Sequence, residues 1–203
     1  MKLIAFIFTL HFILSSNTCI AQGAQELKKI SSFFQTHSDT TLLLKDESNW
    51  IQTPRFWLIS KKADTISAYQ YGLDKLDLPR MPNAIAQHMF RINYMASMDI
   101  DVNPYLKALP SDKHSLDKMW AALLKFTPWT IRDDSTDGHA CDGRDSKIYD
   151  AGGISLTLIT KKDIRRLYFY APSFYESSEG CPGRDGRLKI IEIKKLFDDL
   201  FRK

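Results

Sequence analysis

The sequence predicts an α+β domain in which an antiparallel sheet, built from two β-hairpins plus short strands, carries three to four helices packed mainly on one face. Two observations favour this fold class. Two pairs of segments rich in aromatic and β-branched residues are each separated by a short polar turn, which is the pattern of a β-hairpin. The helical segments do not alternate regularly with the strands, so a doubly wound parallel sheet is not expected.

The size and charge of the chain limit its class. It has 203 residues, of which 44% are hydrophobic and 26% are charged, as in ordinary globular proteins. A single domain over residues 22–203 is expected, because two full cores need a longer chain. The 28 basic residues are nearly balanced by 24 acidic ones. This balance argues against a nucleic-acid partner, which requires a clustered basic face.

Residues 1–21 have the features of a cleaved signal peptide. Lys2 precedes an apolar run over residues 3–14, and a polar step follows. Cys19 and Ala21 then place small residues at the −3 and −1 positions of a signal-peptidase site. The apolar run is too short for a transmembrane helix, and no later segment is long and apolar enough. We therefore expect an exported protein, periplasmic or secreted, with lipid anchoring through Cys19 as the alternative.

Removal of this leader leaves Cys141 and Cys181 as the cysteines of the mature chain. In an oxidising compartment an isolated pair is expected to form a disulfide. Closing a loop of about 41 residues would contribute up to roughly 4 kcal/mol in the chain-entropy treatment. Two free thiols or a metal pair are the alternatives, but the sequence has no CxxC motif and no histidine at zinc-like spacing.

The first part of the mature chain is expected to contain a helix, a hairpin and a second helix. Residues 24–37 carry apolar side chains at helical spacing. Residues 55–71 predict the first hairpin. Residues 83–98 follow Pro82 and repeat apolar residues along one stripe, which again predicts a helix. The segment 38–54 has a mixed pattern and is assigned no element.

A third helix is expected between Ser111 and residue 125. Ser111 is suited to the N-cap position, and helical spacing predicts an inward stripe of Leu116, Trp120, Leu123 and Leu124. Pro128 would end this helix near residue 126, since a proline disfavours helical backbone in the residue before it.

The remainder of the chain is expected to form a short strand, a hairpin and a closing helix. Residues 129–132 are assigned to the strand and residues 154–170 to the second hairpin. Residues 133–145 and 172–186 are rich in turn-forming residues and predict long polar loops. Residues 188–202 carry an apolar stripe at helical spacing.

A disulfide between the two cysteines would join these two loops. Long connections in compact domains are often functional, and these carry aromatic and arginine residues of the kind enriched in protein-binding surfaces. The candidate binding residues are His139, Arg144, Phe174, Tyr175 and Arg184. The alternative is that Phe174 and Tyr175 only cover the edge of the sheet.

The first loop also imitates the start of an EF-hand calcium site. Oxygen-bearing side chains stand at alternate positions from Asp133 to Asp137 and precede Gly138. The similarity then fails, because Arg144 occupies the position of the bidentate glutamate. A calcium site built from Asp133, Asp137 and Asp142 is therefore an alternative to an ordinary cluster of turn residues.

The sequence lacks the motifs of the common catalytic sites: a nucleophile elbow, a zinc-binding helix, a phosphate loop and a dinucleotide fingerprint. No cofactor is expected. We expect a non-catalytic module that binds another exported or envelope protein, such as an inhibitor, an immunity-type protein or an envelope accessory factor.

Two alternatives for the function stay open. One is a hydrolase of envelope polymers or peptides, with an acid–base pair formed by His139 and Asp142 or Asp145, or with carboxylates such as Glu176 and Asp137. The other is a small-ligand or calcium-binding module.

Overall fold

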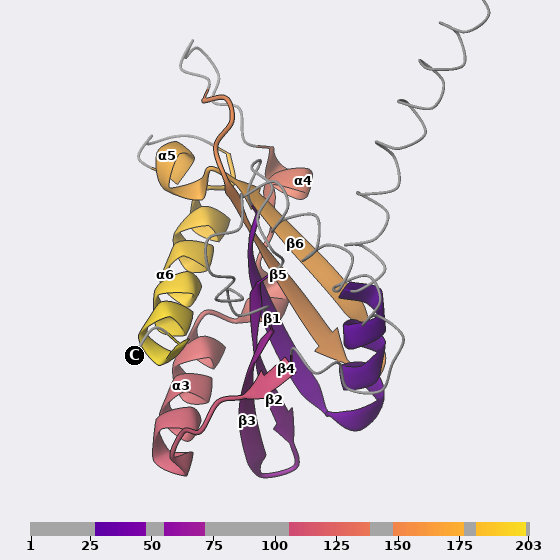
Figure 1. Cartoon of the computed structure of the whole chain (residues 1–203). Helices are drawn as coiled ribbons and strands as arrows, with labels where there is room; N and C mark the ends of the chain where they lie inside the picture. The colour runs from indigo at the N-terminus through magenta and orange to yellow at the C-terminus, as the bar shows by residue number, and fades with distance from the viewer. Residues whose placement is uncertain (1–26, 48–54, 72–105, 139–147, 177–181, 202–203) are drawn as a thin grey trace, which may run out of the picture.

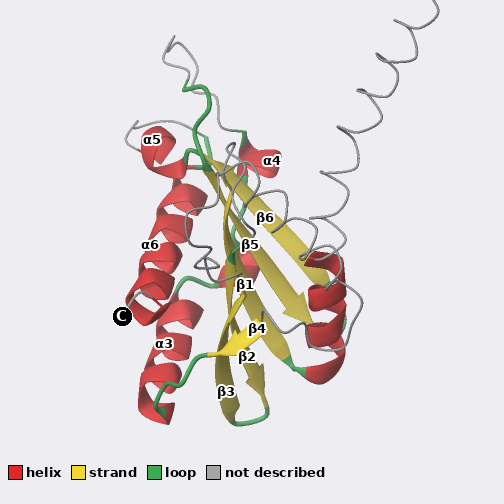
Figure 2. Ribbon diagram, viewed as in Figure 1, coloured by secondary structure: helices red, strands yellow, loops and turns green. Residues whose placement is uncertain are grey.

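The structure is a computed structural model that describes residues 27–47, 55–71, 106–138, 148–176 and 182–201. Within these ranges the chain forms a six-stranded antiparallel sheet with the strand order β4-β3-β2-β1-β5-β6, and helices lie beside it (Figure 1; Figure 2). The predicted α+β class with an antiparallel sheet is confirmed.

The centre of the sheet is β1 (Thr40–Glu47). It pairs antiparallel with β2 (Phe56–Lys62) on one side and with β5 (Gly153–Thr160) on the other. The three leucines at positions 42–44 are fully buried. A continuous apolar run of this kind is typical of a strand that is covered on both faces, so the unassigned segment 38–54 contains the central strand.

Both predicted hairpins are present. β2 continues into β3 (Thr65–Tyr71), and β5 continues into β6 (Ile164–Tyr170). A short strand, β4 (Leu106–Ala108), pairs with β3. In this sheet β4 and β6 are therefore the two edge strands.

The larger part of the core lies between the sheet and two helices, α3 (Lys113–Lys125) and α6 (Arg184–Phe201). Both helices lie along the same side of the sheet (Figure 1). Each presents an apolar stripe at helical spacing. The buried side chains of these stripes are Leu116, Met119, Trp120 and Leu123 in α3, and Ile190, Ile193 and Phe197 in α6.

A further helix, over residues 27–37, covers part of the other face. Its Phe34 belongs to a second buried cluster with Leu43 of β1 and Leu58 of β2. The helices are thus divided between the two faces, whereas the sequence predicts them mainly on one. The physical reason is the leucine run of β1, which places apolar side chains alternately on both faces.

The start of α3 differs from the prediction by one residue. Asp112, not Ser111, is the N-cap, and its carboxylate oxygen Oδ1 accepts a hydrogen bond from Ser115 N at 2.9 Å. Met119 rather than Leu124 completes the inward stripe, and Leu124 is 42% exposed. Both residues before the helix are good caps, so the sequence does not distinguish between them.

The predicted strand at 129–132 is wrong, because this segment begins as a short 3₁₀ helix, η1 (Pro128–Thr130). The predicted loops contain two short helices, α4 (Asp134–Asp137) and α5 (Pro172–Glu176). α6 begins before the predicted residue 188, so the second loop is shorter than expected.

Several predictions fall on residues that the structure does not describe. These are the leader over residues 1–21, the helix over residues 83–98, and the disulfide between Cys141 and Cys181. In the parts of the chain that are described, no helix combines the length and apolar character needed to cross a bilayer.

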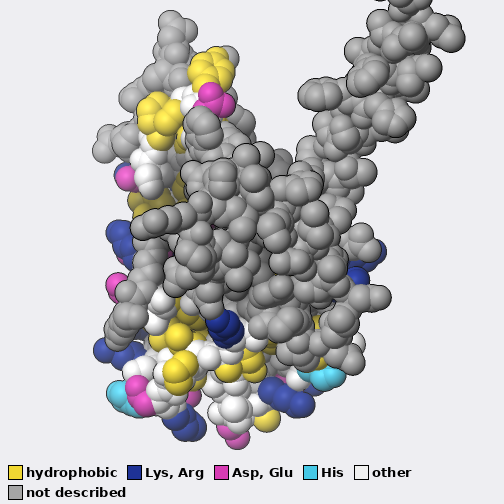
Figure 3. Space-filling model, viewed as in Figure 1, with side chains coloured by type: hydrophobic (Ala, Val, Ile, Leu, Met, Phe, Trp, Pro, Cys, Tyr) yellow, Lys and Arg dark blue, Asp and Glu magenta, His cyan; other side chains and the backbone are white. Residues whose placement is uncertain are grey.

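On the described surface visible in Figure 3, basic and acidic side chains are interspersed over the end of the molecule that carries α3 and the β2–β3 turn. This mixture matches the near balance of charges in the sequence.

Candidate functional site

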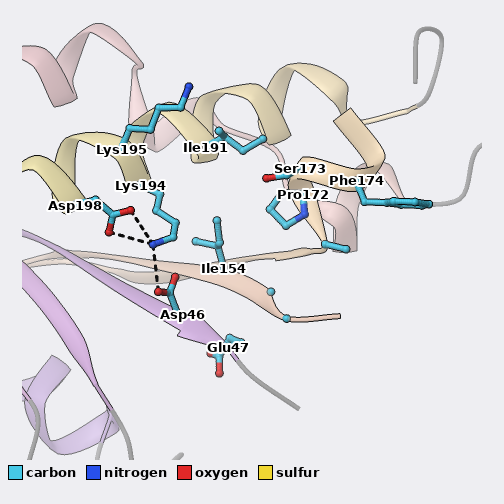
Figure 4. Close-up of a pocket in the computed structure, with 13 residues that line it drawn as sticks. Asp46, Glu47, Ile154, Pro172, Ser173, Phe174, Ile191, Lys194, Lys195 and Asp198 are labelled. Carbon is cyan, nitrogen blue, oxygen red and sulfur yellow. Dashed lines mark hydrogen bonds and ion pairs between the residues drawn. The ribbon is translucent and has the colours of Figure 1, made fainter. Parts of the chain in front are cut away.

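An open groove of about 540 Å³ lies between α5, α6 and the adjoining ends of β1 and β5 (Figure 4). Its apolar lining comes from three elements: Ile154 of β5, Pro172 and Phe174 of α5, and Ile191 of α6. The Phe174 side chain is 39% exposed, which is a large exposure for an aromatic ring. The groove therefore presents apolar surface to solvent.

Charged side chains line the rest of this groove. Lys194 of α6 reaches toward β1, where its ammonium nitrogen lies 3.2 Å from Asp46 Oδ2 and 3.1 Å from each carboxylate oxygen of Asp198 (Figure 4). Lys195 pairs with Glu192 on the same helix. Partly exposed pairs of this kind contribute about 1 kcal/mol or less each, so they orient the side chains more than they stabilise the fold.

Backbone strain is present in the groove wall at Ala171, whose φ is 42°. An alanine in this left-handed region costs about 1–2 kcal/mol. The Ala171 amide donates to Gly152 O at 3.0 Å, and its carbonyl accepts from Phe174 N at 2.9 Å. The strained residue thus starts α5 and fixes the position of Phe174. Strained backbone is concentrated at functional sites.

A second candidate region lies on the sheet face opposite α3 and α6, on β1, β5 and β6. Polar side chains alternate along these strands and therefore point to the same side of the sheet. Together they form the Glu47 cluster, which consists of Lys45, Glu47, Ser155, Thr157, Arg166 and Tyr168. The strand register places Ser155 beside Lys45 and beside Tyr168. It places Thr157 beside Arg166.

Glu47 is the centre of this cluster. Its Oε1 accepts hydrogen bonds from Ser155 Oγ at 2.8 Å and from Arg166 Nη2 at 2.6 Å. Its Oε2 accepts from Lys45 Nζ at 2.6 Å. Burial raises the pKa of Glu47, but the hydrogen bonds and charges of these neighbours outweigh burial and hold the pKa below its usual value. Glu47 is therefore ionised at neutral pH.

The Tyr168 ring lies over Gly153 at the start of β5. A Cβ built on Gly153 would lie 2.9 Å from both Cε2 and Oη of Tyr168, so only a glycine leaves room for this ring. Gly153 pairs in register with Glu47, which places the tyrosine hydroxyl close to the carboxylate. Burial, followed by the negative charge of Glu47, raises the pKa of Tyr168. Its hydroxyl therefore keeps its proton at neutral pH and can donate.

The residues predicted to bind calcium have protein partners in the structure. The Asp133 carboxylate accepts from Ser135 Oγ at 2.6 Å and from the backbone amide of Tyr168 at 2.9 Å. Asp137 pairs with Arg132 at 2.7 Å. Asp142 lies outside the described residues. Among the residues that are described, no group of three or more side chains is arranged to hold a metal ion.

The sequence gives no signal for the most deeply buried ion pair of the described chain. Arg187 of α6 is fully buried, and its Nη1 donates to Asp134 Oδ1 at 3.0 Å. The same guanidinium also donates to the carbonyls of Gly138 and Pro182. Asp134 Oδ2 accepts from the backbone amide of Tyr170 at 2.7 Å. Together these groups form the Arg187 clamp. An arginine at the start of an amphipathic helix normally indicates an exposed residue.

Three of the five predicted binding residues lie in the described structure, and each has a different place there. Phe174 lines the groove. Tyr175 is 6% exposed and packs against Tyr170, so it covers the end of the sheet. Arg184 donates from Nε to Glu176 O at 3.1 Å, which holds the start of α6 next to α5. The other two residues, His139 and Arg144, lie outside the described residues, as do Asp142 and Asp145 of the alternative acid–base pair.

Comparison of the chain with protein-family models, with curated proteins and with solved structures gave no match. What the groove and the Glu47 cluster can do is therefore inferred from their own geometry.

Proposed function

We propose that the protein is an exported, non-catalytic domain that binds another exported or envelope protein through the groove between α5, α6 and the ends of β1 and β5. The exposed apolar surface of this groove, with Phe174 at 39% exposure, carries the proposal. An apolar centre with a charged rim is the usual anatomy of a protein-binding surface, and aromatic side chains there often dominate the binding energy.

The titratable groups of the groove favour binding over catalysis. Lys194 is engaged by two carboxylates, those of Asp46 and Asp198. The pKa of Glu47, which also lines the groove, is held below its usual value. A general acid or base that works near neutral pH needs a pKa close to that pH. Glu47 is thus held as a fixed charge.

Export and the disulfide between Cys141 and Cys181 are part of this proposal. Export is supported by the signal-peptide pattern of the first 21 residues. The disulfide is supported by how closely its flanking segments approach: a Cβ built on Gly183 would lie 3.3 Å from Gly138 O. Gly138 lies three residues before Cys141 and Gly183 lies two residues after Cys181, so segments that flank the two cysteines approach each other.

The disulfide and the leader are both tested by the mass of the protein recovered from its native host. We expect a chain that begins at Gln22 and shows no alkylation by iodoacetamide until it is reduced. Alkylation of two thiols without reduction would exclude the disulfide, and an intact residue 1 would exclude cleavage of the leader.

The groove is tested by partner retention. The full precursor, tagged at the C-terminus, is expressed in its native host, cross-linked in intact cells and purified. We expect one stoichiometric protein partner, with affinity reduced about 30-fold by Phe174→Ala, the size of a strong aromatic contribution. Leu124→Ala is the matched control, because Leu124 is 42% exposed on α3, away from the groove.

Two outcomes would contradict the proposed function. Equal retention of the partner by Phe174→Ala and Leu124→Ala would exclude the groove as the binding surface. Turnover of envelope polymers or peptides by the purified protein, with no protein retained, would favour the hydrolase alternative.

A further inference from the structure

The segment over residues 129–134 covers part of the outer edge of β6, and we call it the edge strap. Asp133 Oδ2 accepts a hydrogen bond from the Tyr168 amide at 2.9 Å, and Asp134 Oδ2 accepts one from the Tyr170 amide at 2.7 Å. Both donors belong to the backbone of an edge strand, where an added strand would otherwise bind them. The two carboxylates thus take the place of a neighbouring strand.

The β5–β6 ladder shows how much of this edge is covered. In an antiparallel ladder every second residue directs its amide and its carbonyl away from the partner strand. Since Tyr168 and Tyr170 donate outward, the other outward residues of β6 are Ile164 and Arg166. In the described structure the amides of these two residues have no acceptor. The stretch left open, residues 164–166, is as short as the three-residue β4 at the opposite edge of the sheet.

The edge strap is itself fixed to the body of the domain. Ile131 is 1% exposed and belongs to the main core. The guanidinium of Arg165 donates to the carbonyls of Trp129 and Ile131 at 2.6 Å each. Asp134 is bonded by the buried Arg187, and α4, which follows the strap, contacts β6 (Figure 1). The edge of β6 therefore stays covered in the folded chain.

We propose that the edge strap keeps the chain monomeric by blocking the pairing of β6 with β6 of a second copy. Such a pairing, related by a two-fold axis, would join two six-stranded sheets into one. Ile164 and Tyr168 are each 39% exposed, so this pairing would also bury apolar surface. It needs outward amides and carbonyls along both strands, and the strap leaves too short a stretch of them.

Hydrogen exchange in the purified protein tests the cover directly. The Tyr168 and Tyr170 amides should exchange at least about 10-fold more slowly than the Arg166 amide, although all three point away from β5. Equal exchange at the three positions would overturn the assignment of the strap as the cover of this edge. This comparison does not depend on the folding of any variant.

Opening the edge tests the block on pairing. Asp133→Ala combined with Arg165→Ala removes the hydrogen bonds of residues 129–133 to β6 and leaves the Arg187 clamp intact. Sedimentation velocity over a concentration series should show a reversible dimer, with a dissociation constant at least about 10-fold below that of the wild type, the size of one net hydrogen bond. Asp133→Asn keeps an oxygen that can accept from the Tyr168 amide and should sediment like the wild type.

Two further variants separate edge pairing from general loss of stability. Ile164→Lys, added to the double variant, should restore the monomer, because a charge on an edge strand opposes pairing. Met119→Ala removes core contacts of α3 and leaves β6 unchanged, so it should stay monomeric. The proposal fails if the folded double variant sediments like the wild type, if Ile164→Lys does not reduce its association, or if Met119→Ala associates as strongly.

Discussion

The Arg187 clamp and the Glu47 cluster both join a carboxylate to a guanidinium, but they differ in access to solvent. The side chains of Arg187 and Asp134 are 0% and 5% exposed, whereas those of Arg166 and Glu47 are 48% and 20% exposed. Arg187 Nε is also without an acceptor in the described structure. The guanidinium of Arg187 is thus closed off from solvent, whereas that of Arg166 is half exposed.

The difference in access predicts a difference in role. In the clamp the chain itself supplies the acceptors, since Arg187 donates to one carboxylate and to two backbone carbonyls. The clamp thereby fixes α6 to the segments that precede Cys141 and follow Cys181. In the cluster the donors outnumber the acceptors and face solvent. We therefore expect the clamp to contribute more to the free energy of unfolding than the cluster does.

The largest effect is expected from breaking the clamp. Arg187→Met leaves the Asp134 carboxylate buried and without its charge partner, which should lower the free energy of unfolding by about 3–5 kcal/mol. Urea denaturation measures this loss. The control Asp199→Asn, at an exposed position on the same helix, should change the free energy of unfolding by less than about 0.5 kcal/mol. A loss below about 1 kcal/mol for Arg187→Met would show that the clamp is not a main source of stability.

A somewhat smaller loss is expected from Gly186→Ala. A Cβ on Gly186 would lie 2.1 Å from Arg132 O, so α6 must move away from the segment before α4. Such overpacking typically costs about 1–3 kcal/mol. Gly138→Ala is an instructive comparison, because Gly138 has a φ of 77° but nothing within 4 Å of its built Cβ. Gly138→Ala therefore tests backbone strain without a steric clash. In urea denaturation it should lower the free energy of unfolding by less than Gly186→Ala does.

Acid should weaken the Glu47 cluster. The folded pKa of Glu47 lies below the ordinary 4.5, so ionised Glu47 stabilises the fold above about pH 4.5, and this contribution is lost as the pH falls through the lowered pKa. Glu47→Gln should cost about 1–2 kcal/mol at pH 7. Urea denaturation at a series of pH values measures this, and the difference in free energy of unfolding between Glu47→Gln and the wild type should shrink toward pH 3. A constant difference across that range would contradict the assigned ion pairs.

The smallest effect is expected from Ala171→Gly in the groove wall. Glycine adopts the positive φ of this position without steric cost. The variant should be about 0.5 kcal/mol more stable than the wild type, because relief of strain exceeds the added freedom of the unfolded chain. The midpoint of thermal unfolding measures this gain. A loss of stability would mean that the local backbone is not strained.

The parts of the fold that the sequence predicts are those with local signals. Both hairpins are marked by polar turns between β-branched and aromatic runs, and α3 and α6 are marked by apolar stripes. The central strand was harder to predict, because the run at 42–44 has neither a period of two nor a helical period. Its burial on both faces depends on helices that lie elsewhere in the sequence.

Of the groove, the sequence predicts only Phe174, an aromatic residue in a segment with the composition of an exposed loop. Asp133 and Asp134 have the appearance of ordinary turn residues, yet they accept hydrogen bonds from the amides of Tyr168 and Tyr170 on an edge strand. Arg166, which binds Glu47, lies 119 residues after it. One signal was available: polar residues at alternate positions of β1, β5 and β6 interrupt otherwise apolar strands.

The pairing of β1 with β5 also bears on how the chain folds. β1 can pair early with β2, which follows soon after it, but Ser155 of β5 arrives 108 residues after Glu47 of β1. Sheets that depend on such distant pairings form slowly, over milliseconds to seconds. During that interval the leucine strand has an unpaired edge that can join with other chains. The edge of β1 is therefore open to pairing with other chains until β5, in the last quarter of the chain, pairs with it.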